Sequence, residues 1–146
     1  MNRRCQRIGL AASDGVRFNS CGDTAYLSIF KHRSRNDAKH LVSIWCITPD
    51  DECHVFCLAE NESWKDQAGN YWSVPDMSES DYGTRGERVA FFPRPTNAPD
   101  PWHGYPLGRK SGVGSKKNPP DALIAAWFNA RRINFTRQQR LLTGRW

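Results

Sequence analysis

The chain has 146 residues, a formal net charge of +6 and a mean hydropathy of −0.71, and its length fits one domain with one core. It contains no run of eighteen apolar residues, which argues against a membrane-spanning helix and a membrane partner. Aromatic residues make up 12% of the chain, a content that argues against a disordered polymer and predicts a core rich in rings.

Two features favour a cytoplasmic location. The apolar stretch after the basic N-terminus covers only residues 8–12, which is shorter than the hydrophobic core of a signal peptide. The number of cysteines is odd, and they lack the dense, even spacing of a secreted disulfide scaffold. We therefore expect mostly reduced thiols at Cys5, Cys21, Cys46, Cys53 and Cys57.

The first half of the chain is typical of β structure. Aromatic and β-branched residues fill 24–30, and two similar runs at 40–48 and 53–59 flank a short Pro-Asp-Asp turn. That arrangement predicts a β-hairpin. Further strands are expected at 71–75 and 88–92, so that these runs together form an antiparallel meander.

The second half begins with proline and ends with helix signals. Five prolines between residues 93 and 106 require an extended or turning backbone. A first helix is expected from Pro119, with Asn118 as its cap and Arg131 and Arg132 in its last turn. A second, short helix is expected from Thr136, where Gln139 three residues later completes a capping box.

The expected fold class is therefore α+β. It consists of an N-terminal antiparallel β-meander of about four to five strands with a C-terminal pair of short helices packed on it. We expect a single domain over residues 1–146. Its parts are a β-rich region at 1–92, a proline-rich and basic loop at 93–118, and a helical tail at 119–146.

Charge is distributed unevenly along this chain. Residues 101–146 carry nine Lys or Arg and one acid, Asp121, for a net +8, whereas residues 50–81 carry nine acids and one base, Lys65, for a net −8. A basic end of this kind attracts polyanions. The alternative is that the basic and acidic segments pair with each other in the fold.

From this charge pattern we expect contact with DNA or RNA. Cationic side chains bind phosphates, and Arg and Gln are side chains that read base edges. Two helices with a short linker resemble a helix-turn-helix in outline, and the alternative is an ordinary helical hairpin packed on the sheet. The candidate contact residues are Arg109, Lys110, Lys116, Lys117, Arg131, Arg132, Arg137, Gln138 and Arg140.

The segment 101–106 is the most distinctive short stretch. It places His103 between Trp102 and Tyr105, rings that can stack on bases or on a protein partner. The alternative is a rigid aromatic turn that covers an edge of the core. His103 is also a candidate general base, although the sequence supplies it with no fixed partner, so the pattern leans against an enzyme.

A metal or cofactor site is not expected. Cys46, Cys53, Cys57 and His54 lie close in sequence. On a strand, however, Cys53 and Cys57 would be separated by about 13 Å, at roughly 3.3 Å per residue. Zinc needs ligands that converge at about 2.0–2.3 Å from the metal.

The first hypothesis is therefore a small basic accessory protein that contacts nucleic acid through its C-terminal loop and helices. A second hypothesis is a protein-binding module, such as an inhibitor, an antitoxin or a complex subunit. It would use the aromatic–proline segment and the acidic residues Asp50, Asp51, Glu52, Glu60, Glu62 and Asp66, which otherwise form a solvated rim. The third hypothesis is an enzyme that uses His103.

Overall fold

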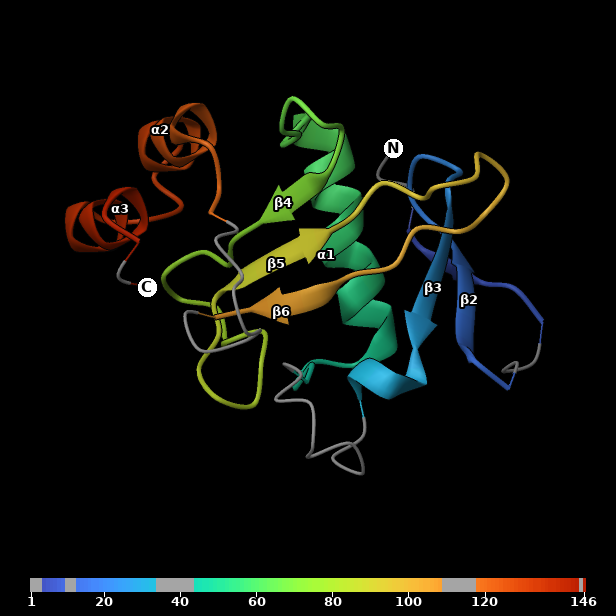
Figure 1. Cartoon of the computed structure of the whole chain (residues 1–146). Helices are drawn as coiled ribbons and strands as arrows, with labels where there is room; N and C mark the ends of the chain where they lie inside the picture. The colour runs from blue at the N-terminus through green and yellow to red at the C-terminus, as the bar shows by residue number, and fades with distance from the viewer. Residues whose placement is uncertain (1–3, 10–12, 34–43, 109–117, 145) are drawn as a thin grey trace.

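The computed structural model describes residues 4–9, 13–33, 44–108, 118–144 and 146. Within these residues the chain forms two three-stranded antiparallel sheets, three α-helices and one short 3-10 helix (Figure 1). The α+β class is confirmed. The single meander of four to five strands is wrong, because the strands are divided between two separate sheets.

The first sheet has the order β1 (Gln6–Arg7), β2 (Gly15–Asn19), β3 (Ala25–Ile29), and the 3-10 helix η1 (Phe30–His32) follows it. The predicted strand at 24–30 is confirmed as β3. β1 and β2 were not predicted, although β2 alternates buried and more exposed positions as a strand with one face on the core does.

The predicted hairpin over 40–59 is wrong, because Pro49–Glu62 forms helix α1. Thr48 is its N-cap and accepts a hydrogen bond from the Asp51 amide at 3.1 Å. Proline at the first helical position and acids in the first turn both favour a helix start. The acidic stretch therefore begins a helix instead of turning a hairpin. Of the predicted strand at 40–48, the described part contributes a bridge between Trp45 and Gly83.

The second sheet has the order β4 (Tyr71–Ser73), β5 (Val89–Phe92), β6 (Tyr105–Leu107). The predicted strands at 71–75 and 88–92 are confirmed as β4 and β5. β6 was not predicted because it contains a proline, but it is an edge strand of this sheet, where a missing backbone N–H is tolerated.

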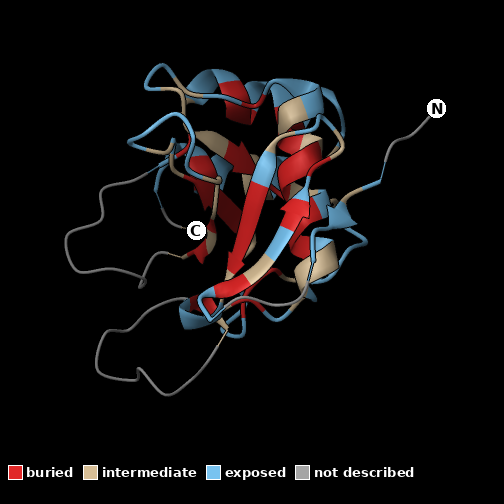
Figure 2. Cartoon of the chain, turned by 90° about the vertical axis from the view of Figure 1, so that its right-hand side faces the viewer, coloured by how far each residue is buried: buried red, intermediate tan, exposed pale blue. Residues whose placement is uncertain are grey.

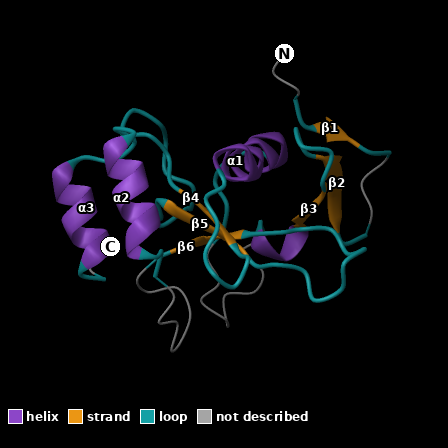
Figure 3. Ribbon diagram, turned by 90° about the horizontal axis from the view of Figure 1, so that it is seen from above, coloured by secondary structure: helices purple, strands orange, loops and turns teal. Residues whose placement is uncertain are grey.

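A short parallel bridge joins β3 to Trp102, in the segment that leads into β6. The Leu27 amide donates to the Trp102 carbonyl at 2.7 Å, and the Trp102 amide donates to the Ala25 carbonyl at 2.9 Å. Seen from above, the first sheet lies at one end of the second sheet, and the helices α2 (Asp121–Asn129) and α3 (Phe135–Leu142) lie at the other end (Figure 3).

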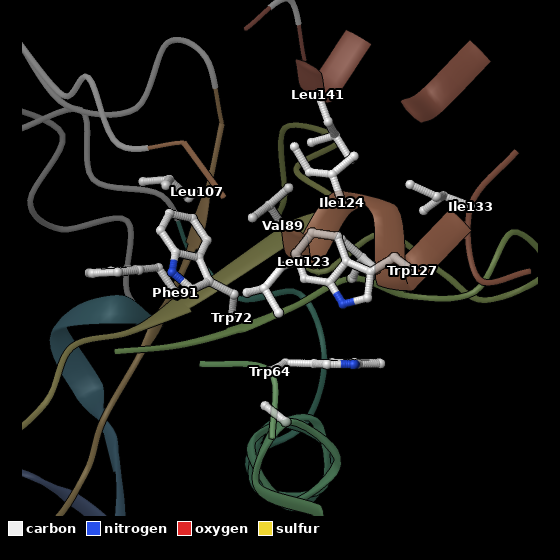
Figure 4. Close-up of a cluster of buried hydrophobic side chains, with 12 residues drawn as sticks. Trp64, Trp72, Val89, Phe91, Leu107, Leu123, Ile124, Trp127, Ile133 and Leu141 are labelled. Carbon is white, nitrogen blue, oxygen red and sulfur yellow. The ribbon is translucent and has the colours of Figure 1, made fainter. Parts of the chain in front are cut away.

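Successive residues of β5 face two different parts of the core. Phe92 packs with Phe56 of α1, with ring centroids 5.3 Å apart. Phe91 belongs to the cluster that contains Trp127 of α2. In that cluster Trp64 and Trp127 meet edge to face at 5.8 Å (Figure 4). The sheet is thus packed on both faces, and buried residues follow its strands and the inner side of α1 (Figure 2).

The two C-terminal helices exist as predicted, but their ends differ. Pro120 is the N-cap of α2, without a side-chain cap, and the Asn118 amide group instead donates to the Leu141 carbonyl at 3.0 Å. α3 is capped by Asn134, which accepts from the Arg137 amide at 2.8 Å, so the predicted capping box at Thr136 is wrong.

None of the helices in the described part of the chain has both the length and the apolar character needed to cross a membrane.

Candidate nucleic-acid interface

Arg137 is the most unusual cation of the C-terminal tail. Its side chain is half-buried on α3. Burial is the main cause that lowers its pKa, and the positive charges of Arg88 and Arg140 lower it further, whereas the negative charge of Asp81 raises it. Its guanidinium makes no hydrogen bond or ion pair with the described residues. The Arg137 guanidinium is therefore subject to two like charges, from Arg88 and Arg140, and to one opposite charge, from Asp81.

Arg88 is the rigid member of this group. Its guanidinium donates to the Glu79 carbonyl at 3.0 Å, to Asp81 Oδ1 at 2.9 Å and to the Asp76 carbonyl at 2.8 Å. Sequence reasoning missed Arg88 because about fifty positions separate it from α3. Its position just before β5 does not indicate that it interacts with a residue of α3.

Arg140 is exposed in the last turn of α3, where a positive charge complements the helix dipole. It lies three residues after Arg137, so the two side chains share one side of the helix. Gln138 is half-buried on the same helix. We call Arg88, Arg137 and Arg140 the arginine surface.

The other two predicted helix cations have different surroundings. Arg132 donates to the Val74 carbonyl at 2.7 Å and to Glu79 Oε1 at 3.2 Å, and its guanidinium lies over the Trp64 ring at 5.4 Å. Through these contacts Arg132 stabilises the fold. Arg131 is exposed between the helices with φ 61°, beside an open pocket that Met77 also lines.

Arg109, Lys110, Lys116 and Lys117 lie outside the described residues, but both flanks of their segment are placed. Leu107 pairs with Val89, the neighbour of Arg88. At the other flank, Asn118 is bonded to Leu141 of α3. The covalent chain therefore enters and leaves the basic segment beside the elements that carry the arginine surface.

The predicted stacking rings are packed against the core. Trp102 meets Phe56 at 5.5 Å and Tyr71 at 5.0 Å between ring centroids. Tyr105 meets Phe91 at 5.8 Å. Both side chains are half-buried, an arrangement that matches the covering aromatic turn considered as the alternative.

His103 lies against a second histidine that sequence reasoning did not single out. The rings of His32 and His103 are nearly parallel, with centroids 6.3 Å apart. Burial, Lys31 and His103 lower the pKa of His32 to about 4, and burial and Lys31 lower the pKa of His103. Both imidazoles are thus neutral at neutral pH, the form in which an imidazole accepts a proton.

Much of the acidic middle segment contacts the protein's own fold. Asp50 forms an ion pair with Arg7 at 2.6 Å. Glu60 accepts from the hydroxyls of Ser20 and Thr24, both at 2.5 Å. Among the ion pairs of the described residues, Arg132 with Glu79 at 3.2 Å joins the acidic segment to the basic C-terminal one. Arg137 and Arg140 form no ion pair within the described residues, although the charge of Asp81, the partner of Arg88, also acts on Arg137.

Two cysteines that were considered as metal ligands lie on a helix and not on the expected strand. On α1, Cys53 and Cys57 are one helical turn apart instead of about 13 Å. Cys57 forms a disulfide with Cys21, which differs from the expectation of mostly reduced thiols, and Cys5 lies beside this pair. Cys46 and His54 are both exposed, and neither belongs to the Cys5–Cys21–Cys57 group that could hold a metal ion.

Comparison with known proteins returned no match among family models, curated proteins or solved structures. The described part of the chain is a small α+β protein.

Proposed function

We propose that the protein binds nucleic acid through the arginine surface, with Arg137 as its central phosphate contact. The observation that carries this proposal is that Arg137 is half-buried and subject to the like charges of Arg88 and Arg140, which the opposite charge of Asp81 only partly offsets. Desolvation and like charges both disfavour a cation. A polyanion would offset this cost, and phosphate binding would also release condensed counterions.

The contacts of each arginine support different roles. Arg88 is held by two carbonyls and by an ion pair with Asp81, so it would offer a fixed guanidinium whose charge Asp81 partly offsets. Arg140 is exposed and would add a second flexible phosphate contact. Gln138 lies next to Arg137 on α3 and has the amide chemistry that reads adenine edges.

The basic segment would extend this surface. Arg109, Lys110, Lys116 and Lys117 are joined by the chain to Leu107 and Asn118, which flank the arginine surface. We propose that these four cations make further phosphate contacts. Arg132, whose guanidinium is bonded to Val74 and Glu79, is assigned to the fold in this proposal.

The experiment is an equilibrium titration of the full chain against labelled single-stranded and duplex DNA and RNA at low salt. The test variant is Arg137→Gln/Arg140→Gln. The matched control is Arg17→Gln/Arg94→Gln, which removes the same charge from two exposed arginines outside α3. Affinity should fall roughly tenfold or more in the test variant, at about 1 kcal/mol for each lost charged contact. Equal affinities of the test and control variants would refute the proposed site.

The paired rings of His32 and His103 favour a second candidate function, in which His103 is a general base. A neutral imidazole can accept the proton of an attacking hydroxyl, such as an RNA 2′-hydroxyl. Incubating the protein with labelled RNA tests this directly. Cleavage that is lost in His103→Gln while binding persists would support it, and cleavage that survives this substitution would exclude it.

A further inference from the structure

A pocket lies where the turn between α2 and α3 faces the loop that follows β4. Its volume is about 480 Å³, within the roughly 300–1,000 Å³ of typical ligand sites. The lining residues come from these two parts of the chain and are Met77, Phe128, Asn129, Arg131, Ile133 and Asn134. We call this the Met77 pocket, and it shares no residue with the arginine surface.

Half of the lining of the Met77 pocket is apolar. Met77 and Phe128 keep 47% and 36% of their surfaces exposed, whereas Ile133 is buried in the adjoining core cluster. Methionine is common at surfaces that bind peptides, because its unbranched side chain adapts to different partners. An apolar side chain of a ligand would therefore find apolar contacts in this pocket.

Arg131 is the charged residue of the lining. It is exposed, and its guanidinium makes no hydrogen bond or ion pair with the described residues. Its neighbour Arg132, in contrast, is paired with Glu79. The pocket thus combines a free guanidinium with an apolar surface, which is complementary to a carboxylate beside a large apolar side chain.

The backbone conformation at Arg131 disfavours an arginine. Its φ is 61°. Its amide donates to the Phe128 carbonyl at 3.0 Å, and the next amide along the chain donates to the Trp127 carbonyl at 2.9 Å. These two bonds form a Schellman motif, whose left-handed residue is usually glycine. Strained backbone is concentrated at functional sites, so the guanidinium at this position points to a role in binding.

Hydrogen bonds hold both walls of the Met77 pocket in place. Arg132 Nη2 donates to the Val74 carbonyl at 2.7 Å, which fastens the turn after α2 to the segment that follows β4. In that segment, Asp76 Oδ1 accepts from the amide and the hydroxyl of Ser78 at 2.7 and 2.6 Å, and these bonds fix the turn that carries Met77. A ligand would therefore meet a preformed site and lose little affinity to ordering of the protein.

We propose that the Met77 pocket binds an acidic segment of a partner protein, in which a carboxylate stands next to a leucine or phenylalanine. The carboxylate pairs with Arg131, and the apolar side chain packs on Met77 and Phe128. The exposed amide of Asn129 can donate to and accept from the peptide backbone. One cation beside an apolar surface favours a peptide over a nucleic acid, which is held by several phosphate contacts.

The test is a fluorescence anisotropy titration of the full chain with a labelled peptide in which aspartates flank leucine and phenylalanine. Wild type should bind this peptide, and asparagine in place of its aspartates should remove binding. Arg131→Gln should weaken affinity about tenfold, as expected for one charged hydrogen bond, and Phe128→Ala by a similar factor. The matched controls Arg94→Gln and Phe30→Ala, at exposed positions outside the pocket, should keep the wild-type affinity.

Arg131→Gly separates binding from stability. It introduces the residue that this backbone favours, so it should raise the urea concentration at the unfolding midpoint. It should nevertheless weaken peptide binding as much as Arg131→Gln does. A variant that is more stable and binds less cannot have lost binding through misfolding.

The proposal is overturned if wild type does not bind the acidic peptide, or if Arg131→Gln and Arg94→Gln bind it equally well. Self-association of wild type that Phe128→Ala abolishes, measured by analytical ultracentrifugation, would assign the pocket to a second copy and also overturn it. Arg131→Gln should leave nucleic-acid affinity at the wild-type level. A loss as large as that of Arg137→Gln/Arg140→Gln would assign the pocket to nucleic acid instead, so this proposal and the proposed function can fail separately.

Discussion

The Asn118 side chain donates its amide to the Leu141 carbonyl, 3.0 Å away at the end of α3. Its oxygen accepts from the indole N–H of Trp146. Asn118 thereby ties the residue that follows the basic segment to the helix that carries Arg137 and Arg140. This link connects the two parts of the proposed interface.

Asn118→Ala should lower the free energy of unfolding by about 1 kcal/mol, because a hydrogen bond of this kind contributes roughly 0.5–1.5 kcal/mol. Urea denaturation measures the loss. The control is Asn97→Ala, since Asn97 bonds to Asp100 in an exposed loop, and its stability should change little. Equal losses in the two variants would contradict the anchoring role of Asn118.

Trp127→Ala should cost about 3–5 kcal/mol of unfolding free energy, because a fully buried ring leaves a cavity when it is removed. Phe128→Ala, at the next and exposed position of α2, should cost far less. Thermal or urea unfolding of both variants checks the orientation of α2 on the sheet. Similar costs for the two substitutions would mean that the helix is rotated from the position described.

Glu52 should make the protein less stable as pH rises. Its side chain is fully buried, with Arg33 Nη2 3.7 Å from one carboxylate oxygen, and burial raises its pKa to about 7. The folded state therefore holds this proton more tightly than the unfolded state, so stability is lost as pH rises from about 4.5 through 7. Glu52→Gln should remove this dependence. Urea unfolding at a series of pH values measures it, and an unchanged profile would contradict the prediction.

His32 should act in the opposite direction over nearly the same range. Its pKa is lowered to about 4, so the unfolded state binds the proton more readily and stability is lost as pH falls from about 6.5 to 4. His32→Gln should reduce acid sensitivity in this window. His54→Gln, at an exposed position, is the control, and an equal effect in both variants would disprove a special role of the buried imidazole.

The local strand signals were sufficient for β3, β4 and β5, because each is a short run of aromatic or β-branched residues with a chain-breaking flank. α1 was missed for a definable reason. Its apolar run from Cys53 to Ala59 suggested a strand, yet its buried residues recur with helical spacing. Thr48 and Pro49 before an acidic turn were the overlooked helix signal.

The candidate sites depend on contacts between distant segments, which no local pattern reveals. Arg88 approaches Arg137 across about fifty residues, and His32 approaches His103 across about seventy. Cys5 and Cys21 reach the cysteines of α1 only because the first sheet packs on that helix. The basic character of the tail was visible in the sequence. The sequence did not show that Arg132 makes hydrogen bonds within the fold whereas the Arg137 guanidinium makes none with the described residues.

The salt dependence of binding tests the central claim most directly. The logarithm of the nucleic-acid binding constant is measured against the logarithm of salt concentration for wild type, Arg137→Gln/Arg140→Gln and Arg17→Gln/Arg94→Gln. If Arg137 and Arg140 each neutralise a phosphate, the slope of the first variant should be shallower by about two, and the control should keep the wild-type slope. Three identical slopes, or no binding even at low salt, would contradict the arginine surface as a nucleic-acid interface.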